Sequence, residues 1–215
     1  PGAISVLAIS EKGNLFNAPE TYMNKIAVGK DVPFDATDLD YPIKKNISNI
    51  AEAKNKNIDE LTVCILDRPR HKDIIEELKS LKVNLKLITD GDICGSLLVT
   101  DNKYNVDLFL GIGGGPEGVI SAAALDAYGC KFQGKFLFAT DRDKARAKKM
   151  GISDLNKKYE LNEIVKGDSI FCATGITSTE IVAAIKKEKT KFITETLVTH
   201  KETSIEIIKS EEPIA

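Results

Sequence analysis

A buried strand, a run of glycines and an alanine-rich helix follow one another in residues 106–128, which read VDLFLGIGGGPEGVISAAALDAY. The apolar run 106–110 is bounded by glycine, as expected of a strand buried on both faces. Pro116 suits a first helical turn, where its missing N–H would be unbonded anyway. The segment therefore predicts a strand, a bare glycine turn and a helix. The free amides and the positive dipole end at the start of this helix favour the binding of a phosphate.

Glu117 lies in the first turn of this predicted helix, close to where the phosphate would bind. A carboxylate there interacts favourably with the helix dipole, by about 0.3–1 kcal/mol, and that alone would explain its presence. Beside a triple glycine a second interpretation competes, in which a divalent cation bridges the carboxylate and the phosphate. The sequence leaves both interpretations open.

Composition restricts the class of protein. The 215 residues allow one large or two small domains, and 30 basic against 32 acidic residues give a net charge of −2. No apolar run approaches the ~20 residues of a membrane helix, and no signal-peptide pattern opens the chain. Four widely separated cysteines without a C-x-x-C motif are typical of reduced thiols. We therefore predict a cytoplasmic protein with no nucleic-acid partner and no membrane partner.

From residue 61 onward, strand and helix patterns alternate along the chain. This alternation predicts an α/β fold with a mostly parallel sheet flanked by helices, and residues 61–215 are expected to form a C-terminal α/β domain. Ligands of such sheets gather at the carboxyl ends of the strands. Four loops are predicted at that edge, and they are basic, acidic, glycine-rich and hydroxyl-rich in turn: residues 67–70, 89–92, 111–117 and 174–177.

Residues 1–60 have a different pattern and are predicted to be the remnant of an N-terminal domain. Residues 3–9 and 14–16 predict a strand hairpin, which is followed by a loop and by a helix over residues 45–56. The chain enters its first strand directly after Pro1, without a preceding cap. We expect it to be the interior of a longer protein.

Near the other end of the chain, residues 177–180 read TSTE. This is a capping box, and it predicts a helix that ends near Lys187. Residues 192–198 and 204–208 predict a closing pair of antiparallel strands.

Charged residues follow two of the predicted strands. Arg68 and Arg70 flank Pro69, which stiffens the loop, and two guanidiniums so spaced can grip one phosphate through paired hydrogen bonds. Solvated surface arginines are the commoner outcome for isolated residues, but a position at a strand end favours a ligand. Asp90 and Asp92 alternate about Gly91, where they can accept sugar hydroxyls, take a metal, or form an Asp-Gly turn.

Two further residues have structural and functional interpretations. Tyr22 can donate its phenol to a phosphate, although a half-buried strand tyrosine is the commoner situation. His71 has no visible serine or cysteine partner in the sequence, so we expect it to be structural or exposed.

A dinucleotide site is the alternative interpretation. The stretch GGGPEG, from Gly113 through Gly118, satisfies G-x-G-x-x-G after a strand, and Asp141 follows at the end of the next strand. An NAD(P)-binding oxidoreductase domain would have this pattern. Against it, Glu117 would put an anion where the pyrophosphate must lie, and the charged loops after the other strands would have no role.

Six segments in matching order, spanning nearly the whole chain, share one resemblance. They read NAPETYMNK, LTVCILDRPRH, TDGD, GIGGGPEGVISAA, ATGIT and TETL, beginning at residues 17, 61, 89, 111, 173 and 194. Together they resemble the class II fructose-1,6-bisphosphatases of the GlpX type. The resemblance implies a metal-dependent phosphatase of the lithium-sensitive sugar and inositol phosphatase fold. Such an enzyme removes the 1-phosphate of fructose 1,6-bisphosphate to give fructose 6-phosphate in gluconeogenesis, and some relatives also use sedoheptulose 1,7-bisphosphate.

The resemblance also implies roles for individual residues. Glu117 matches the family's metal-ligand glutamate, for Mg²⁺ or Mn²⁺. The positions that match its substrate contacts are Tyr22, Arg68, Pro69, Arg70, Asp90, Gly91, Asp92 and Gly114. Arg68 stands where a lysine is common, which preserves the charge but alters the donor geometry.

One departure from the family pattern concerns the metal site. The family's remaining metal carboxylates lie upstream of the segment that matches residues 3–9, and none of that region is in this chain. The resemblance therefore implies that the chain needs an N-terminal segment and has little or no activity alone, because a single carboxylate rarely fixes a catalytic Mg²⁺. We also predict a homo-oligomer.

Overall fold

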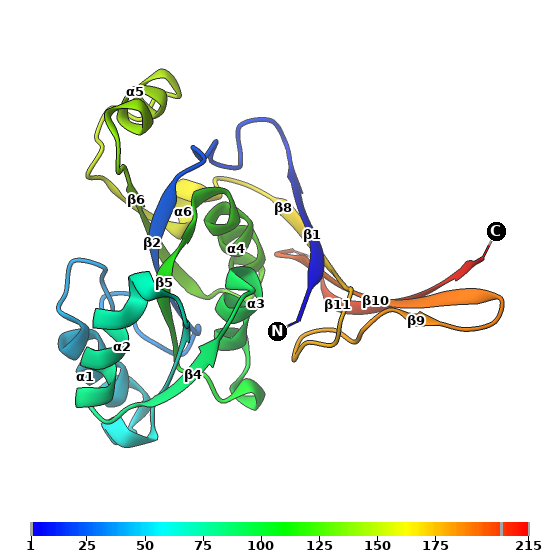
Figure 1. The fold of residues 1–215 in the computed structure, drawn as a ribbon, viewed down its shortest axis with the longest axis horizontal. Coiled ribbons are helices and arrows are strands. Elements are labelled where there is room, and N and C mark those ends of the chain that lie inside the picture. Colours follow the sequence, from blue (N-terminus) through cyan, green and yellow to red (C-terminus); the bar gives the residue numbers. More distant parts are fainter. Residues whose placement is uncertain (1, 203, 215) are drawn as a thin grey trace.

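The computed structural model describes residues 2–202 and 204–214, which form two β-sheets and the helices around them (Figure 1). The strands are β1 (Ile4–Ser10), β2 (Tyr22–Val28), β3 (Thr62–Leu66), β4 (Asn84–Ile88), β5 (Leu108–Gly114), β6 (Lys131–Leu137), β7 (Lys158–Glu160), β8 (Ser169–Gly175), β9 (Lys186–Lys187), β10 (Lys191–His200) and β11 (Ser204–Pro213). The α-helices are α1 (Ile43–Lys54), α2 (Lys72–Ser80), α3 (Asp92–Leu97), α4 (Gly115–Ala127), α5 (Asp141–Lys149) and α6 (Leu161–Ile164). The 3₁₀ helices are η1 (Ile58–Glu60), η2 (Pro69–His71), η3 (Leu98–Thr100) and η4 (Asn102–Tyr104).

A six-stranded sheet has the order β4-β3-β5-β2-β6-β7. Strand β3 is parallel to β4 and β5, as the alternating pattern predicts. Strand β2 is antiparallel to both of its neighbours, β5 and β6, and β7 is antiparallel to β6. The sheet is therefore mixed, and the prediction of a mostly parallel sheet is wrong. The cause is β2, which comes from the segment before residue 61 and inserts between two strands that α4 connects.

Helices cover both faces of this sheet, as predicted (Figure 1). Helices α1 and α2 pack on one face, in a core that includes Ile50, Ile65 and Leu78. Helices α3 and α4 pack on the other face, around Phe109. Helix α4 also packs on β1, β8 and β10 of the second sheet. Burial between two sheets explains why α4 is rich in alanine, because small side chains let both sheets approach its backbone.

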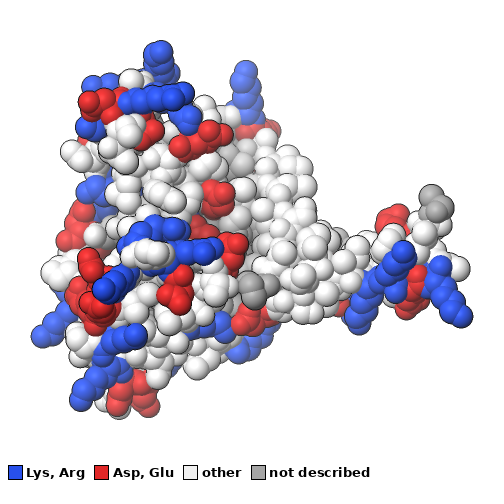
Figure 2. Space-filling model, in the orientation of Figure 1, with Lys and Arg blue, Asp and Glu red and all other residues white. Residues whose placement is uncertain are grey.

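The second sheet is antiparallel, with the order β1-β8-β10-β11 and with β9 beside β10. The pairing of β10 with β11 confirms the predicted closing pair, and this ribbon extends away from the rest of the molecule (Figure 1). Phe171 and Ala173 face α4, whereas Leu7, Ile9 and Ile170 alternate with the inward residues and are exposed. The surface of β1 and β8 is accordingly free of charged side chains in the space-filling view (Figure 2).

The predicted hairpin of residues 3–9 and 14–16 is wrong. Strand β1 pairs with β8, more than 150 residues away in the chain, in a register that joins Ile4 to Gly175. The second expected strand is reduced to one isolated bridge between Leu15 and Val165. A partner so distant in sequence leaves no local signal, and the alternation in β1 is equally compatible with either pairing.

The helix predicted from the capping box at residues 177–180 is also wrong. Residues 176–185 form neither helix nor strand. The hydroxyl of Thr177 accepts a hydrogen bond from the Ala3 N–H at 2.7 Å, so it fastens the start of β1 instead of capping a helix. Gly175 lies against the backbone of Ala183, which the folded-back chain brings close.

The other local predictions agree with the structure. All five residues of β3 are buried, as expected of a continuous apolar run. Helix α1 lies where a helix over residues 45–56 was predicted, within two residues at each end. Residues 1–60 supply β1 to one sheet and β2 to the other. The domain boundary at residue 60 stays a prediction. No helix among the described residues has the length and apolar character needed to cross a membrane.

Asp107, directly before β5, has a buried carboxylate that contacts the start of β3 and two lysines that precede it. Its carboxylate accepts hydrogen bonds from the Thr62 N–H at 3.0 Å and from Lys56 Nζ at 2.8 Å. Lys54 Nζ lies 3.2 Å from the same carboxylate. Burial alone would raise the pKa of Asp107, but the hydrogen bonds and the lysine charges outweigh it and lower the pKa below 3.8. The stabilisation is therefore present above pH 3.8 and is lost as the pH falls through the lowered pKa.

We predict that Asp107→Asn lowers the free energy of unfolding at pH 7 by about 2–4 kcal/mol, because two lysines and a backbone amide lose their anion. Asp31→Asn, which removes an exposed partner of the same Lys54, should cost about 0.5 kcal/mol or less. Urea unfolding measures both variants at pH 7 and at an acid pH below the lowered pKa of Asp107, where the carboxyl is protonated in the folded protein. The role of Asp107 would be contradicted if both variants lost the same free energy of unfolding. It would also be contradicted if Asp107→Asn remained less stable than the unchanged protein at that acid pH.

Candidate functional site

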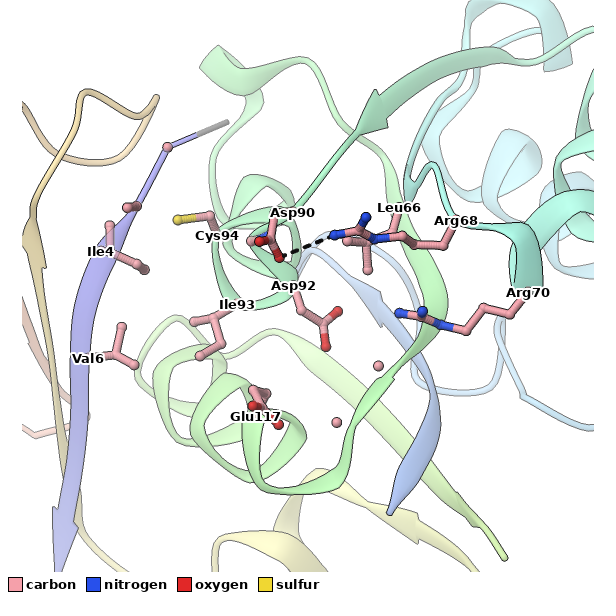
Figure 3. Close-up of a pocket in the computed structure, with 15 residues that line it drawn as sticks. Ile4, Val6, Leu66, Arg68, Arg70, Asp90, Asp92, Ile93, Cys94 and Glu117 are labelled. Carbon is pink, nitrogen blue, oxygen red and sulfur yellow. Dashed lines mark hydrogen bonds and ion pairs between the residues drawn. The ribbon is translucent and has the colours of Figure 1, made fainter. Parts of the chain in front are cut away.

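A cavity of about 820 Å³ lies at the carboxyl ends of the three parallel strands β3, β4 and β5. Three of the four loops predicted to gather there do so, namely 67–70, 89–92 and 111–117. The opposite wall is the start of β1, with Ile4 and Val6 (Figure 3). The loop 174–177 does not line this cavity, so this part of the prediction is wrong.

The arginine loop extends from β3 into this cavity. Arg68 is extended, and Pro69 begins the 3₁₀ helix η2, so the proline fixes the turn as predicted. An Arg68 terminal nitrogen lies 4.0 Å from Asp90 Oδ1 (Figure 3). Arg70 Nε donates a hydrogen bond to the Ile112 carbonyl at 2.8 Å. That bond aims the guanidinium along β5 and leaves its terminal nitrogens without a hydrogen-bond partner among the described residues.

The Asp90-Gly91-Asp92 loop forms the start of α3. Asp90 Oδ1 accepts a hydrogen bond from the Gly91 N–H at 2.9 Å, and the Asp90 side chain is otherwise exposed. Gly91 has φ of 90°, a left-handed conformation that favours glycine. Asp92 is turned inward, and its Oδ2 accepts a hydrogen bond from Lys25 Nζ. The two aspartates are therefore not equivalent, although they are two residues apart in one loop.

Lys25 is a residue of this site that the sequence interpretation missed. Its side chain has no exposed surface, and its ammonium donates to Asp92 and, at 3.0 Å, to the Gly114 carbonyl. Burial lowers the pKa of Lys25, against the opposing effect of the Asp92 charge. The signal was present in the sequence, because a lysine directly before the apolar run Ile26–Val28 is expensive to bury without a partner.

The glycines have a different role from the one predicted. Gly111, Gly113 and Gly114 lie in β5, paired with Lys25, Met23 and Tyr22 of β2. The Gly115 N–H, at the start of α4, already donates to the Thr21 carbonyl at 2.8 Å. The expectation of a bare glycine turn is therefore wrong, since these glycines pair with β2, and the Gly115 amide is not free.

Gly113 and Gly114 instead give room to two carboxylates. A Cβ on Gly113 would overlap Asp92 Oδ2 and lie 2.8 Å from Asp92 Cγ and 3.0 Å from Lys25 Nζ. A Cβ on Gly114 would overlap Glu117 Oε2 and lie 2.7 Å from Glu117 Cδ. The absence of side chains at these two positions lets both acidic groups fold over the strand end.

Glu117 occupies the first turn of α4 and is exposed to the cavity (Figure 3). It forms no hydrogen bond or ion pair with the described residues, although its charge reaches Lys25. A carboxylate in this position can supply one oxygen ligand to a hard divalent cation. The described residues contain no cluster of three or more acidic, histidine or cysteine side chains that could hold a metal ion. Glu117 thus fits such an ion only as one member of a larger set.

The charges in the cavity are mostly compensated. Five charged side chains line it: Arg68, Arg70, Asp90, Asp92 and Glu117. Arg68 and Asp90 lie 4.0 Å apart, and Asp92 pairs with the buried Lys25. The terminal nitrogens of Arg70 and the carboxylate of Glu117 remain without a partner of opposite charge in the described chain. The cavity can therefore accept an anion and a cation together.

Tyr22 lies in an adjoining cavity of about 1090 Å³, which shares Arg70, Gly114 and Glu117 with the first. Its ring is half exposed, and Arg70 Cζ lies 4.9 Å from the ring centroid. Tyr22 is therefore not beside Arg68 or the aspartates. Arg70 connects the two cavities, and a ligand long enough to touch Tyr22 and Asp90 must pass it.

His71 is structural, as the sequence suggested. It is fully buried, and its Nε2 accepts a hydrogen bond from the Ile112 N–H at 2.7 Å. Burial and the nearby Arg70 charge lower the pKa of His71, so the ring is neutral at pH 7. It supports the strand end that also holds Arg70.

Comparison with known families identifies the chain. A family model described as bacterial fructose-1,6-bisphosphatase, glpX-encoded, matches residues 1–212. The chain belongs to this family. The resemblance inferred from the six short segments is thereby confirmed.

Two relatives from Synechococcus are both named D-fructose 1,6-bisphosphatase class 2/sedoheptulose 1,7-bisphosphatase. The one from Synechococcus sp. (strain JA-3-3Ab) is 38% identical over 210 residues, which cover 92% of this chain and 60% of the relative. The one from Synechococcus elongatus is 36% identical over 211 residues, which cover 92% and 61%. The chain thus spans about three fifths of the length of the relatives it matches.

The dinucleotide alternative has no support in the fold. The fingerprint needs an acidic residue at the end of the parallel strand next to the glycine-rich strand. Asp141 follows β6, which is separated from β5 by the antiparallel β2. Asp141 is almost fully exposed and pairs with Lys144 at 3.0 Å.

We predict that Gly113→Ala lowers the free energy of unfolding by about 1–3 kcal/mol, because its Cβ displaces the Asp92 carboxylate from Lys25. In an Asp92→Ala background the same change should cost less than about 0.5 kcal/mol, since the overlapping group is gone. Urea unfolding of the four proteins of this cycle measures the coupling. An equal cost in both backgrounds would show that Gly113 does not make room for the carboxylate.

Proposed function

We propose that this chain is the larger part of a phosphatase that hydrolyses the 1-phosphate of fructose 1,6-bisphosphate, with sedoheptulose 1,7-bisphosphate as a second substrate. The observation that supports it most is one cavity in which Arg70 and Glu117 present uncompensated charges of opposite sign. A phosphate ester and a divalent cation satisfy both charges at once. Family membership supports the same reaction class.

In this proposal the substrate lies across Arg70. Arg70 and Tyr22 hold the distal phosphate in the second cavity, with Arg68 contributing charge from the first. Pro69 fixes the spacing of the two guanidiniums. Asp90 and Asp92 accept hydrogen bonds from sugar hydroxyls, and Gly91 and Gly114, which line the cavity, contact the substrate. Binding energy from the distal phosphate then positions the reacting one.

We further propose that Glu117 is one ligand of Mg²⁺ or Mn²⁺. Such an ion, when bound, neutralises phosphate charge, activates a water and stabilises the leaving oxygen. Glu117 contributes an exposed carboxylate at the positive end of α4, directed to the cavity. The other protein ligands of the metal ion would come from outside the described residues. We propose that they lie in an N-terminal segment that completes the lithium-sensitive sugar and inositol phosphatase fold. The complete enzyme is proposed to be a cytoplasmic homo-oligomer.

Glu117→Gln in the full-length protein should lower kcat for Mn²⁺-dependent phosphate release by about 100-fold or more, because metal–charge stabilisation is worth several kcal/mol. Glu20→Gln provides a matched control, since Glu20 is an exposed carboxylate of the second cavity that pairs with Arg146. Its kcat should stay within about twofold of the unchanged protein. Full activity of Glu117→Gln would remove the proposed metal role.

Arg70→Met should raise the KM for fructose 1,6-bisphosphate by about tenfold or more, because a phosphate loses a charge-assisted hydrogen bond. Arg146→Met removes an exposed arginine of α5 outside both cavities and should leave KM unchanged. Steady-state kinetics of phosphate release measures both variants. An unchanged KM in Arg70→Met would mean that the distal phosphate binds elsewhere.

Residues 1–215 alone should release phosphate at a small fraction of the full-length rate, since Glu117 by itself cannot fix the ion. The measurement compares phosphate release by equal amounts of the two proteins with Mn²⁺ present. Comparable rates would contradict the proposal that other ligands lie outside this chain.

A further inference from the structure

Lys25 lies behind the cavity wall, where no ligand can reach it in this arrangement. Its side chain has no exposed surface, and Asp92 and the Gly114 carbonyl take up two of its three donors. A buried ammonium is costly unless it is paired, so its presence on β2 demands the partner that it has. Lys25 thereby connects β2 with the start of α3 and with the junction of β5 and α4.

The two carboxylate oxygens of Asp92 have different surroundings. Oδ2 lies over Gly113 and is held by Lys25, whereas Oδ1 is buried without a hydrogen-bond partner. Without the ammonium, the Asp92 charge would face the carboxylates of Asp90 and Glu117 in one cavity. Lys25 therefore both orients Asp92 and removes its repulsion toward an anionic ligand.

We propose that Lys25 is a positioning residue, which holds the Asp92 carboxylate so that the second lone pair of Oδ2 accepts a hydroxyl of a phosphosugar. This inference rests on the proposed function only for the class of ligand. Lys25 acts through Asp92 and does not bind the phosphate, because its ammonium is enclosed by protein. The arginines remain the phosphate-binding groups.

The test is a double-mutant cycle of Lys25→Met and Asp92→Asn in the full-length protein, read by calorimetric binding of fructose 6-phosphate. Each single change should weaken binding by about tenfold or more, the usual effect of losing a hydrogen bond to a charged group. The double variant should bind no more weakly than the weaker single variant, because both changes remove one interaction. Losses that multiply in the double variant would show that Lys25 acts independently of Asp92.

Inorganic phosphate is the second probe in the same variants. The affinity for inorganic phosphate should fall less in Lys25→Met than the affinity for fructose 6-phosphate, because phosphate loses only charge compensation whereas the sugar also loses an oriented acceptor. A lysine that binds phosphate directly, or one that merely supports the fold, would lower both affinities equally. Lys158→Met is the matched control, because Lys158 pairs with Asp38 and Asp40 outside the first cavity. It should bind both probes normally.

Failure of the unchanged protein to bind fructose 6-phosphate would overturn the proposed function together with this inference. Normal binding by the unchanged protein, with equal binding by Lys25→Met, would overturn the role of Lys25 alone.

Discussion

The pairing of charges at one edge of the mixed sheet determines what this site can hold. Arg68 faces Asp90, and buried Lys25 neutralises Asp92, while Arg70 and Glu117 have no partner of opposite charge in the described chain. A cavity with this balance repels neither an anion nor a cation, and it is best filled by both. The proposed phosphatase chemistry depends on that arrangement more than on any single residue.

The arrangement depends in turn on β2, the strand that makes the sheet mixed. It brings Lys25 behind the first cavity and Tyr22 into the second, and it pairs with the glycines of β5. Because Gly113 and Gly114 have no side chains, the carboxylates of Asp92 and Glu117 can lie over the strand end. The glycines thus make room for the two carboxylates, and these carboxylates in turn face the ligand.

Much of the site was predictable because its signals are local. The charged loops after β3 and β4, and the helix after β5, follow strands whose apolar runs are plain, so three loops could be placed at one edge. The pairing of β2 and β1 was not predictable, since their partners are tens to more than a hundred residues away. The apolar run after Lys25 signals that this lysine needs a partner, but its partner Asp92 is 67 residues away and could not be predicted. The capping box at 177–180 failed because Thr177 bonds to the distant Ala3.

We propose that a cation at Glu117 and a phosphate at Arg70 occupy one cavity together. A crystal structure of the full-length protein with Mn²⁺ and inorganic phosphate, measured at the manganese absorption edge, tests it directly. We expect an anomalous peak beside the Glu117 carboxylate, with the phosphate contacting the terminal nitrogens of Arg70. Manganese bound away from Glu117, or phosphate bound away from both arginines, would contradict it.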